Sequence, residues 1–246
     1  MSLLADWTLD SFTGGGITRA TYTRGRGPGV IVIHEIPGIT PKVIGFANEV
    51  VDAGFTVVMP SLVGEPGKEL SQRYLLQSMT KICVAREFTT WATGETSAIT
   101  GFLQDLARDV HEQCGGPGVG AIGMCFSGGF ALGMMVNGHV VAPVLSQPSL
   151  PFAVGTQRAA DINLSVSDLA TVKQRVADGC QVLGLRFDQD KLVGTRFDTL
   201  RRELGDGFIA VEYPSSSKKD HSVVTEQRVE DGVRRVLDFF REKLQR

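Results

Sequence analysis

Two nucleophile-capable side chains, Cys125 and Ser127, lie two residues apart in the stretch Gly-Met-Cys-Phe-Ser-Gly-Gly at 123–129. A thiol or hydroxyl can attack a carbonyl carbon when a histidine takes its proton and an acid orients that histidine. The surrounding glycines are typical of a sharp strand-to-helix turn that exposes one nucleophile. The stretch therefore predicts acyl-transfer chemistry at one of the two side chains.

The spacing of small residues does not by itself choose between them. A turn of this type needs a small residue two positions before and two positions after the attacking side chain. Centred on Cys125, these positions hold Gly123 and Ser127. Centred on Ser127, they hold Cys125 and Gly129. The apolar run Val119–Ile122 favours Cys125, because the turn should follow within a residue or two and Gly123 is the first residue free to make it. An inert, buried cysteine beside a glycine turn is the alternative interpretation.

The partners that such a nucleophile needs come later in the chain. Asp188 and Asp190 follow one apolar run, and His221 stands in a polar stretch after the next. Either carboxylate could hold the imidazole in the required tautomer. Nucleophile, acid and histidine then follow the chain order of the α/β-hydrolase triad. His34, which precedes Glu35 at the end of an earlier run, is a second histidine candidate by its position.

Short β-branched runs recur along the chain and are typical of strands buried on both faces of a mostly parallel sheet. They lie at 30–33, 55–59, 119–122, 140–145, 182–185 and 208–211. Stretches with helical spacing lie between them, such as the apolar stripe from Ile99 to Val110. The alternation predicts an α/β fold with a doubly wound sheet and helices on both faces. The glycines at 14–16 predict an antiparallel hairpin at the sheet edge.

Length and composition favour one globular domain over residues 1–246, with 42% hydrophobic residues. A formal charge of −2 offers no basic surface for nucleic acid. No stretch approaches the roughly 18 apolar residues of a membrane span, and the first residues lack the pattern of a signal peptide. We therefore expect a cytoplasmic protein that binds neither nucleic acid nor membrane. The segment 61–94 carries a weaker pattern and is interpreted as a loop or a cap over the site.

Together these residues resemble the dienelactone hydrolases, which are cysteine-nucleophile members of the α/β-hydrolase superfamily. The family's Gly-x-Cys-x-Gly-Gly turn is similar to residues 123–129, with Ser127 in the place of a glycine. The likeness extends from about Gly29 to the C-terminus and is weak between Leu62 and Thr96. It is carried by the turn and by the stretches at 34–38, 190–193 and 220–222.

The resemblance implies an enzyme that hydrolyses a small ester, lactone or related carbonyl compound. It implies Cys125 as the nucleophile, His221 as general base and then acid, and Asp190 as the group that orients His221. Backbone N–H groups of Ile36 and Phe126 would form the oxyanion hole. The reaction would run through a thioester and would need neither a metal nor an organic cofactor.

The resemblance also implies that Glu35 contacts the resting nucleophile and takes part in its activation. The chain departs from the family at Thr225, where dienelactone-cleaving members carry an arginine that clamps the substrate carboxylate. A hydroxyl does not replace a bidentate guanidinium. Arg73 or Arg86 could supply another positive group. Two other interpretations stay open: a serine esterase that uses Ser127, and a non-catalytic, ligand-binding member of the fold.

Overall fold

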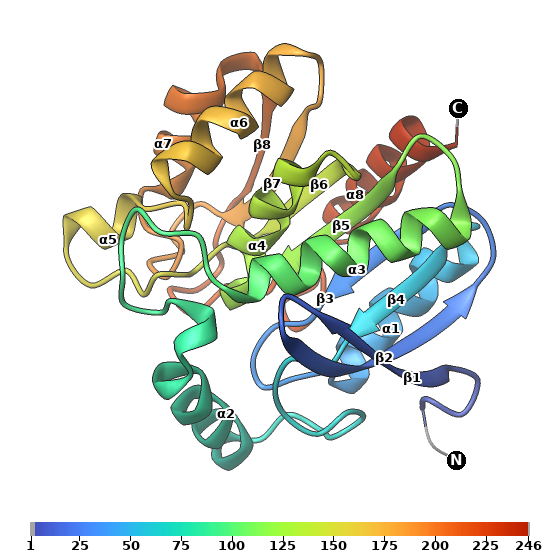
Figure 1. Cartoon of the computed structure of the whole chain (residues 1–246). Coiled ribbons are helices and arrows are strands. Elements are labelled where there is room, and N and C mark those ends of the chain that lie inside the picture. Colours follow the sequence, from blue (N-terminus) through green and yellow to red (C-terminus); the bar gives the residue numbers. More distant parts are fainter. Residues whose placement is uncertain (1–2, 246) are drawn as a thin grey trace.

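An eight-stranded sheet forms the centre of the computed structural model, which describes residues 3–245 (Figure 1). Its strand order is β1-β2-β4-β3-β5-β6-β7-β8. The bounds are β1 Thr8–Gly14, β2 Ile17–Gly25, β3 Gly29–Ile33, β4 Thr56–Pro60, β5 Val119–Met124, β6 Val140–Ser146, β7 Val182–Phe187 and β8 Phe208–Tyr213. β2 pairs antiparallel with β1 and with β4, and the pairs from β4 to β8 are parallel. This arrangement confirms the predicted mostly parallel sheet with an antiparallel edge hairpin.

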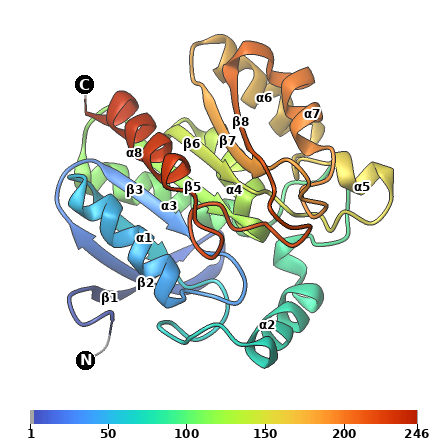
Figure 2. The ribbon, with the colours of Figure 1, turned by 180° about the vertical axis from the view of Figure 1, so that it is seen from behind.

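Helices cover both faces of the sheet, as the sequence predicts. The bounds are α1 Pro41–Asp52, α2 Gln72–Val84, α3 Ile99–Cys114, α4 Gly128–Gly133, α5 Thr156–Ala160, α6 Val166–Ala177, α7 Arg196–Leu204 and α8 Glu230–Leu244. Side chains of α1 and α8 pack on the face turned to the viewer in Figure 2, and those of α3, α4, α6 and α7 on the opposite face. None of the helices between residues 3 and 245 has the length and apolar character that crossing a bilayer requires.

The central strands are buried on both faces because each face has its own apolar layer. In β3, Ile31 and Ile33 belong to the cluster on the α3 side, whereas Val30 and Val32 belong to the cluster formed with α1 and α8. Side chains alternate between the two faces of a strand. A run that looks uniformly apolar in the sequence is therefore divided between two cores.

Two details of the predicted elements differ from the structure. β5 continues to Met124, because its pairing with β6 extends through the last two residues of the strand, so Gly123 lies inside the strand and does not make the turn. Helix α6 is capped by Ser165, whose hydroxyl accepts a hydrogen bond from the first turn of the helix, and not by Ser167, where the Ser-Asp pair before the run Leu169–Val176 predicts a capped start.

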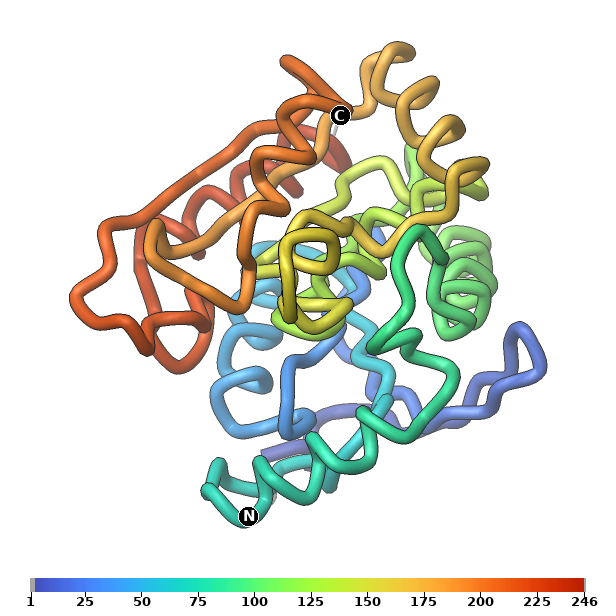
Figure 3. Tube along the Cα trace, turned by 90° about the vertical axis from the view of Figure 1, so that its left-hand side faces the viewer, coloured from blue at the N-terminus to red at the C-terminus, as the bar shows by residue number. Residues whose placement is uncertain are grey.

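Helix α2 occupies part of the segment predicted as a loop or cap, and it lies outside both helix layers (Figure 3). Three side chains on its inner face are buried: Tyr74, Ser78 and Ile82. The hydroxyl of Ser78 donates a hydrogen bond to the carbonyl oxygen of Pro37 at 2.9 Å. Because Pro37 belongs to the loop after β3, this contact ties α2 to the end of a central strand.

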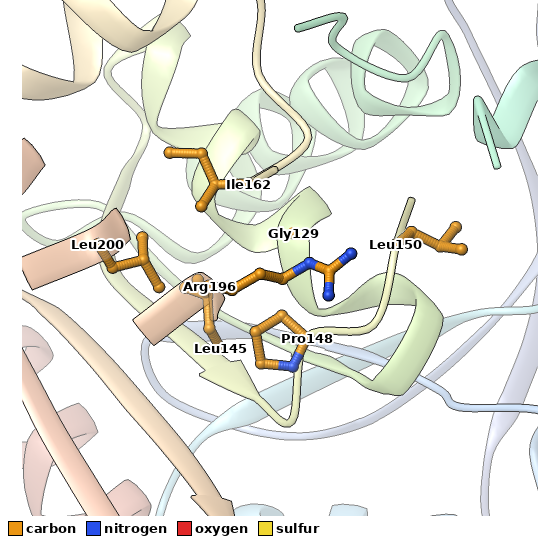
Figure 4. Close-up of a pocket in the computed structure, with 7 residues that line it drawn as sticks. All are labelled: Gly129, Leu145, Pro148, Leu150, Ile162, Arg196 and Leu200. Atoms are coloured by element: carbon orange, nitrogen blue, oxygen red, sulfur yellow. The ribbon is translucent and has the colours of Figure 1, made fainter. Parts of the chain in front are cut away.

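Arg196, the first residue of α7, is fully buried, and its side chain lies beside Pro148 and Leu150 (Figure 4). Its guanidinium donates to the carbonyl oxygens of Leu192 at 3.0 Å, Val193 at 2.8 Å and Arg158 at 2.9 Å, and also to that of Pro151. Burial lowers the pKa of Arg196 to about 10. The group therefore remains charged at neutral pH and satisfies three loop carbonyls and one carbonyl of α5 at once.

We expect Arg196→Met to lower the free energy of unfolding by about 3 kcal/mol, because loop carbonyls lose charged donors while the cost of burying a charge is relieved. For a chain of this size that is a fall of roughly 6–12 °C in the thermal midpoint, measurable by calorimetry. Arg202→Met is the matched control, since Arg202 lies on the same helix but is exposed. It should shift stability by no more than about 0.5 kcal/mol. Equal midpoints for the two variants would contradict the role of Arg196.

Candidate active site

Cys125 opens the turn that follows β5, and its backbone is in the left-handed region. Its φ is +56°, a conformation that residues with a side chain rarely adopt. The 3-10 turn Cys125–Ser127 follows, and α4 continues from it. A Cβ atom on Gly123 would lie 2.1 Å from the carbonyl oxygen of Ser127, so only glycine fits there. Both features are typical of strand-to-helix turns that expose a nucleophile.

Ser127, the other candidate nucleophile, is fully buried inside this turn. Its Oγ accepts a hydrogen bond from the backbone N of Met124 at 2.9 Å. The hydroxyl proton lies within reach of the carbonyl oxygens of Ile33 at 3.0 Å and His34 at 3.1 Å. The hydroxyl of Ser127 therefore links the turn to the end of β3 and is not presented to solvent.

His221 and Asp190 come together although they follow different strands. The imidazole Nδ1 of His221 lies 2.6 Å from Oδ2 of Asp190. The other carboxylate oxygen accepts a hydrogen bond from the backbone N of Leu192 at 2.9 Å, which fixes the carboxylate. Because Nδ1 faces the carboxylate, the free nitrogen is Nε2, which is buried without a hydrogen-bond partner within residues 3–245.

The charged form of His221 is favoured by its neighbours. Burial acts against the charge, but the nearby Cys125 and the hydrogen-bonded Asp190 outweigh it, so the pKa of His221 is raised well above its usual value. A protonated imidazole can donate a proton, and the sulfur atom beside it can attack a carbonyl carbon. The arrangement can therefore supply both a nucleophile and a proton donor.

Asp188 lies apart from this pair. Its carboxylate accepts a hydrogen bond from the backbone N of Ser215 at 2.9 Å in the loop after β8. The hydrogen bond from the Ser215 side chain, together with this backbone contact, lowers the pKa of Asp188. Of the two carboxylates that the sequence leaves open, Asp190 is the one beside His221.

His34, the second histidine candidate, is fully buried and holds a loop in place. Its Nδ1 donates to the carbonyl oxygen of Glu35 at 2.8 Å, and its Nε2 accepts from the backbone N of Leu62 at 3.0 Å and of Val63 at 3.4 Å. Burial lowers the pKa of His34 to about 4, so the ring is neutral at pH 7. Both ring nitrogens are occupied, which leaves none to act as a base.

Glu35 is buried beside the site, and its carboxylate is held by three neutral side chains. Oε2 accepts from Ser222 Oγ at 2.7 Å and from Gln147 Nε2 at 3.3 Å, and Oε1 accepts from the hydroxyl of Thr225. Within residues 3–245 these hydrogen bonds do not include one to Cys125, although both side chains line the same cavity. The resemblance leads us to expect an arginine at position 225. Thr225 stands there instead and donates a hydrogen bond to Glu35.

A cavity of about 310 Å³ lies over Cys125 and His221. Its apolar wall is formed by Ile36, Leu70, Leu75, Met79, Phe152 and Leu192. The charged side chains that line it, besides Glu35 and His221, are Lys219 and Glu226. Arg73 and Arg86 line other surface grooves, so neither supplies the positive group considered from the sequence. Within residues 3–245 no three His, Cys, Asp or Glu side chains are grouped to hold a metal ion.

The two expected oxyanion-hole residues follow neighbouring parallel strands, β3 and β5. Ile36 lines the cavity together with Cys125. Phe126 is the second residue of the 3-10 turn, and amides in the first turn of a helix have no partner within it. The positions are compatible with two N–H groups directed at one oxygen atom.

Gln147 is a site residue that the sequence reasoning missed. It follows β6 directly, is fully buried and has a φ of +36°. Its side-chain oxygen accepts from the backbone N of Val223 at 3.3 Å, while its amide nitrogen contacts Glu35. It joins the loop of His221 to the loop after β3. The rule that ligands bind where strands end would have indicated Gln147, because it is the second residue after the predicted strand at 140–145.

Comparison with known proteins agrees with this fold. Dienelactone hydrolase from Anabaena variabilis is 14% identical, with a TM-score of 0.65, over 97% of this chain and 98% of that chain. A dienelactone hydrolase-like promiscuous phosphotriesterase from metagenomic libraries is 16% identical, with a TM-score of 0.62, over 97% of this chain and 98% of that chain. A cold-adapted esterase from an Arctic intertidal metagenomic library is 14% identical, with a TM-score of 0.61, over 96% of this chain and 93% of that chain. At these identities the likeness shows the fold.

The sequence comparisons give the family. No curated protein sequence matches the chain. The model of the dienelactone hydrolase family matches residues 17–166, which is more than half of the chain. That span includes the turn at Cys125 and the loop after β3. The chain therefore belongs to the dienelactone hydrolase family and is a hydrolase of carboxylic esters or lactones.

Proposed function

We propose that the protein is a cysteine-dependent hydrolase of small esters or lactones in which Cys125, His221 and Asp190 form the catalytic triad. The observation that carries this proposal is the His221–Asp190 hydrogen bond at 2.6 Å beside Cys125. The left-handed backbone at Cys125 and the cavity above it support the same assignment.

In the proposed mechanism the Cys125 thiolate attacks the ester carbonyl carbon. A C–S bond forms, the carbonyl π electrons move to oxygen, and the amides of Ile36 and Phe126 stabilise the oxyanion. Collapse breaks the bond to the leaving oxygen, which takes the proton from Nε2 of His221 and leaves as the alcohol. A thioester on Cys125 remains.

The second half of the reaction releases the acid. Neutral His221 takes a proton from water, and the resulting hydroxide attacks the thioester carbonyl. Collapse of this second oxyanion breaks the C–S bond and returns the thiolate, while the proton taken from water remains on the imidazole for the next cycle. Asp190 keeps the imidazole oriented in both steps. The sum is ester plus water giving acid plus alcohol.

Two alternatives have less support. A serine esterase would need the hydroxyl of Ser127 exposed, but that hydroxyl is buried against Met124 and the end of β3. A non-catalytic binding protein would have no chemical use for a strained cysteine beside a histidine–carboxylate pair. We therefore favour the thiol mechanism.

Cys125→Ala should lower kcat/KM for p-nitrophenyl acetate by at least about 10³-fold, because the covalent route is lost. Ser127→Ala should lower it by less than about tenfold while reducing stability by about 1–3 kcal/mol, because buried backbone groups lose a partner. The assay is release of p-nitrophenol, with urea unfolding of each variant as the control.

The outcomes of this comparison separate the three interpretations. An active Cys125→Ala protein together with an inactive Ser127→Ala protein would show that Ser127 is the nucleophile. If the wild type and both variants are inactive, the rate of alkylation of Cys125 by iodoacetamide distinguishes an enzyme with another substrate from a binding protein. A thiol that stays unreactive at neutral pH would favour the binding protein.

Asp190→Asn should lower kcat/KM by roughly 10²–10⁴-fold, because the imidazole loses its orienting carboxylate. The pKa of His221 is raised in part by Asp190, so its loss should lower that pKa. The imidazolium would then deprotonate at lower pH. The alkaline limb of the pH profile of kcat/KM should therefore move to lower pH. This limb belongs to the coupled thiol–imidazole pair. Asp188→Asn is the matched control and should leave both rate and limb unchanged. The reverse pattern would assign the orienting role to Asp188.

A further inference from the structure

The cavity is lined by more acidic than basic side chains. Two carboxyl groups, Glu35 and Glu226, line it, whereas its one lining lysine, Lys219, is solvent-exposed. Arginine is absent from the lining within residues 3–245. The remaining titratable groups are Cys125 and His221, which carry opposite charges in the reactive state and together add none.

The negative charge of Glu35 is not cancelled by a cation. The three side chains that bind its carboxylate are an amide and two hydroxyls, and all three donate. An ionised carboxylate is an acceptor-only group, so a shell of donors is the pattern that it requires. These neutral donors satisfy the carboxylate oxygens of Glu35 but do not cancel its negative charge. That charge acts on a substrate in the cavity.

Glu226 adds a second carboxyl group to the lining of the cavity. It is half-buried. Burial, with Glu35 and Glu69, raises the pKa of Glu226, and Lys42 acts in the opposite direction. These neighbours already disfavour one more negative charge at this place. A substrate carboxylate would meet the same repulsion.

The rest of the cavity is apolar and partly exposed. Leu70, Met79 and Leu192 line it and are 42%, 36% and 51% exposed. An apolar acyl chain lying on them would remove both its own surface and theirs from water. Burial of one CH₂ group is worth about 0.8 kcal/mol, or roughly fourfold in affinity. The wall therefore favours substrates with hydrocarbon groups.

We propose that this site selects uncharged esters and lactones with an apolar acyl group and excludes substrates that carry a carboxylate, with Glu226 as a specificity-determining residue. The proposal rests on the hydrolase function proposed above. It differs from the expectation for dienelactone, which presents a carboxylate for an arginine to clamp.

Hydrolysis of two esters of equal length tests the proposal. The neutral ester is p-nitrophenyl hexanoate, and the anionic ester is mono-p-nitrophenyl adipate, whose six-carbon acyl chain ends in a carboxylate. We expect kcat/KM at pH 7 to be at least about tenfold higher for the neutral ester at low salt, with a smaller ratio at 1 M salt, because salt screens charge repulsion. Equal values, or a preference for the adipate ester, would overturn the proposal.

Glu226→Gln tests the assigned residue. It keeps the size of the side chain and removes its charge, so it should raise kcat/KM for the adipate ester by about fivefold relative to the hexanoate ester. Glu112→Gln is the matched control. Glu112 is exposed near the C-terminal end of α3. This end of α3 leads into the start of β5, whereas the cavity lies where the strands end. The control should leave the ratio unchanged. The same change in both variants would show an effect of net charge and overturn the role of Glu226.

A second readout does not depend on turnover. Iodoacetamide and iodoacetate alkylate the same thiol and differ in charge, and peptide mass spectrometry distinguishes Cys125 from the other three cysteines. Relative to N-acetylcysteine, Cys125 should disfavour iodoacetate by about tenfold, and Glu226→Gln should reduce this difference. If neither ester is hydrolysed but the alkylation ratio is as expected, the hydrolase proposal fails and the charge selectivity stands. An alkylation ratio equal to that of the free thiol would overturn the selectivity.

Discussion

The left-handed backbone at Cys125 is the constraint on which the rest of the site depends. Such a conformation costs about 1–3 kcal/mol for a residue with a side chain, and it persists only where the surroundings fix it. Here the hydroxyl of Ser127 fastens the turn to the end of β3, and Gly128 lies so close to Pro148 that a Cβ would be 2.6 Å from its Cα. The same turn that presents the thiol also brings the amide of Phe126 next to it.

The general arrangement could be predicted because it depends on local patterns. Apolar runs mark the strands, parallel strands end at one edge of a sheet, and chemically active side chains follow those ends. This pattern of apolar runs places Cys125 after β5, and the two aspartates and His221 after β7 and β8. It leaves Asp188 and Asp190 equivalent, because residues two apart follow the same strand. Only the loop geometry separates them, by pairing one with His221 and the other with Ser215.

The groups that fix the site could not be predicted, because their contacts are distant in sequence. Arg196 has no local feature that distinguishes it from Arg201 and Arg202 in the same helix, yet it alone of the three is buried and bonds to carbonyls up to 45 residues away. Gln147 contacts Glu35 across 112 residues. Spacing and periodicity indicate which side chains can react. The side chains that hold the reactive groups in position are determined by the tertiary structure.

Thr225 shows how one such contact changes the chemistry of the whole cavity. An arginine at this position would place a positive charge beside Glu35 and could also bind a substrate carboxylate. Threonine donates one hydrogen bond to Glu35 and adds no charge. The carboxylate is then satisfied as an acceptor but not neutralised, and it acts together with Glu226 on the same space. In the charge selectivity proposed above, the uncharged Thr225 leaves Glu35 and Glu226 without a neighbouring arginine, which is why we expect the cavity to prefer neutral substrates.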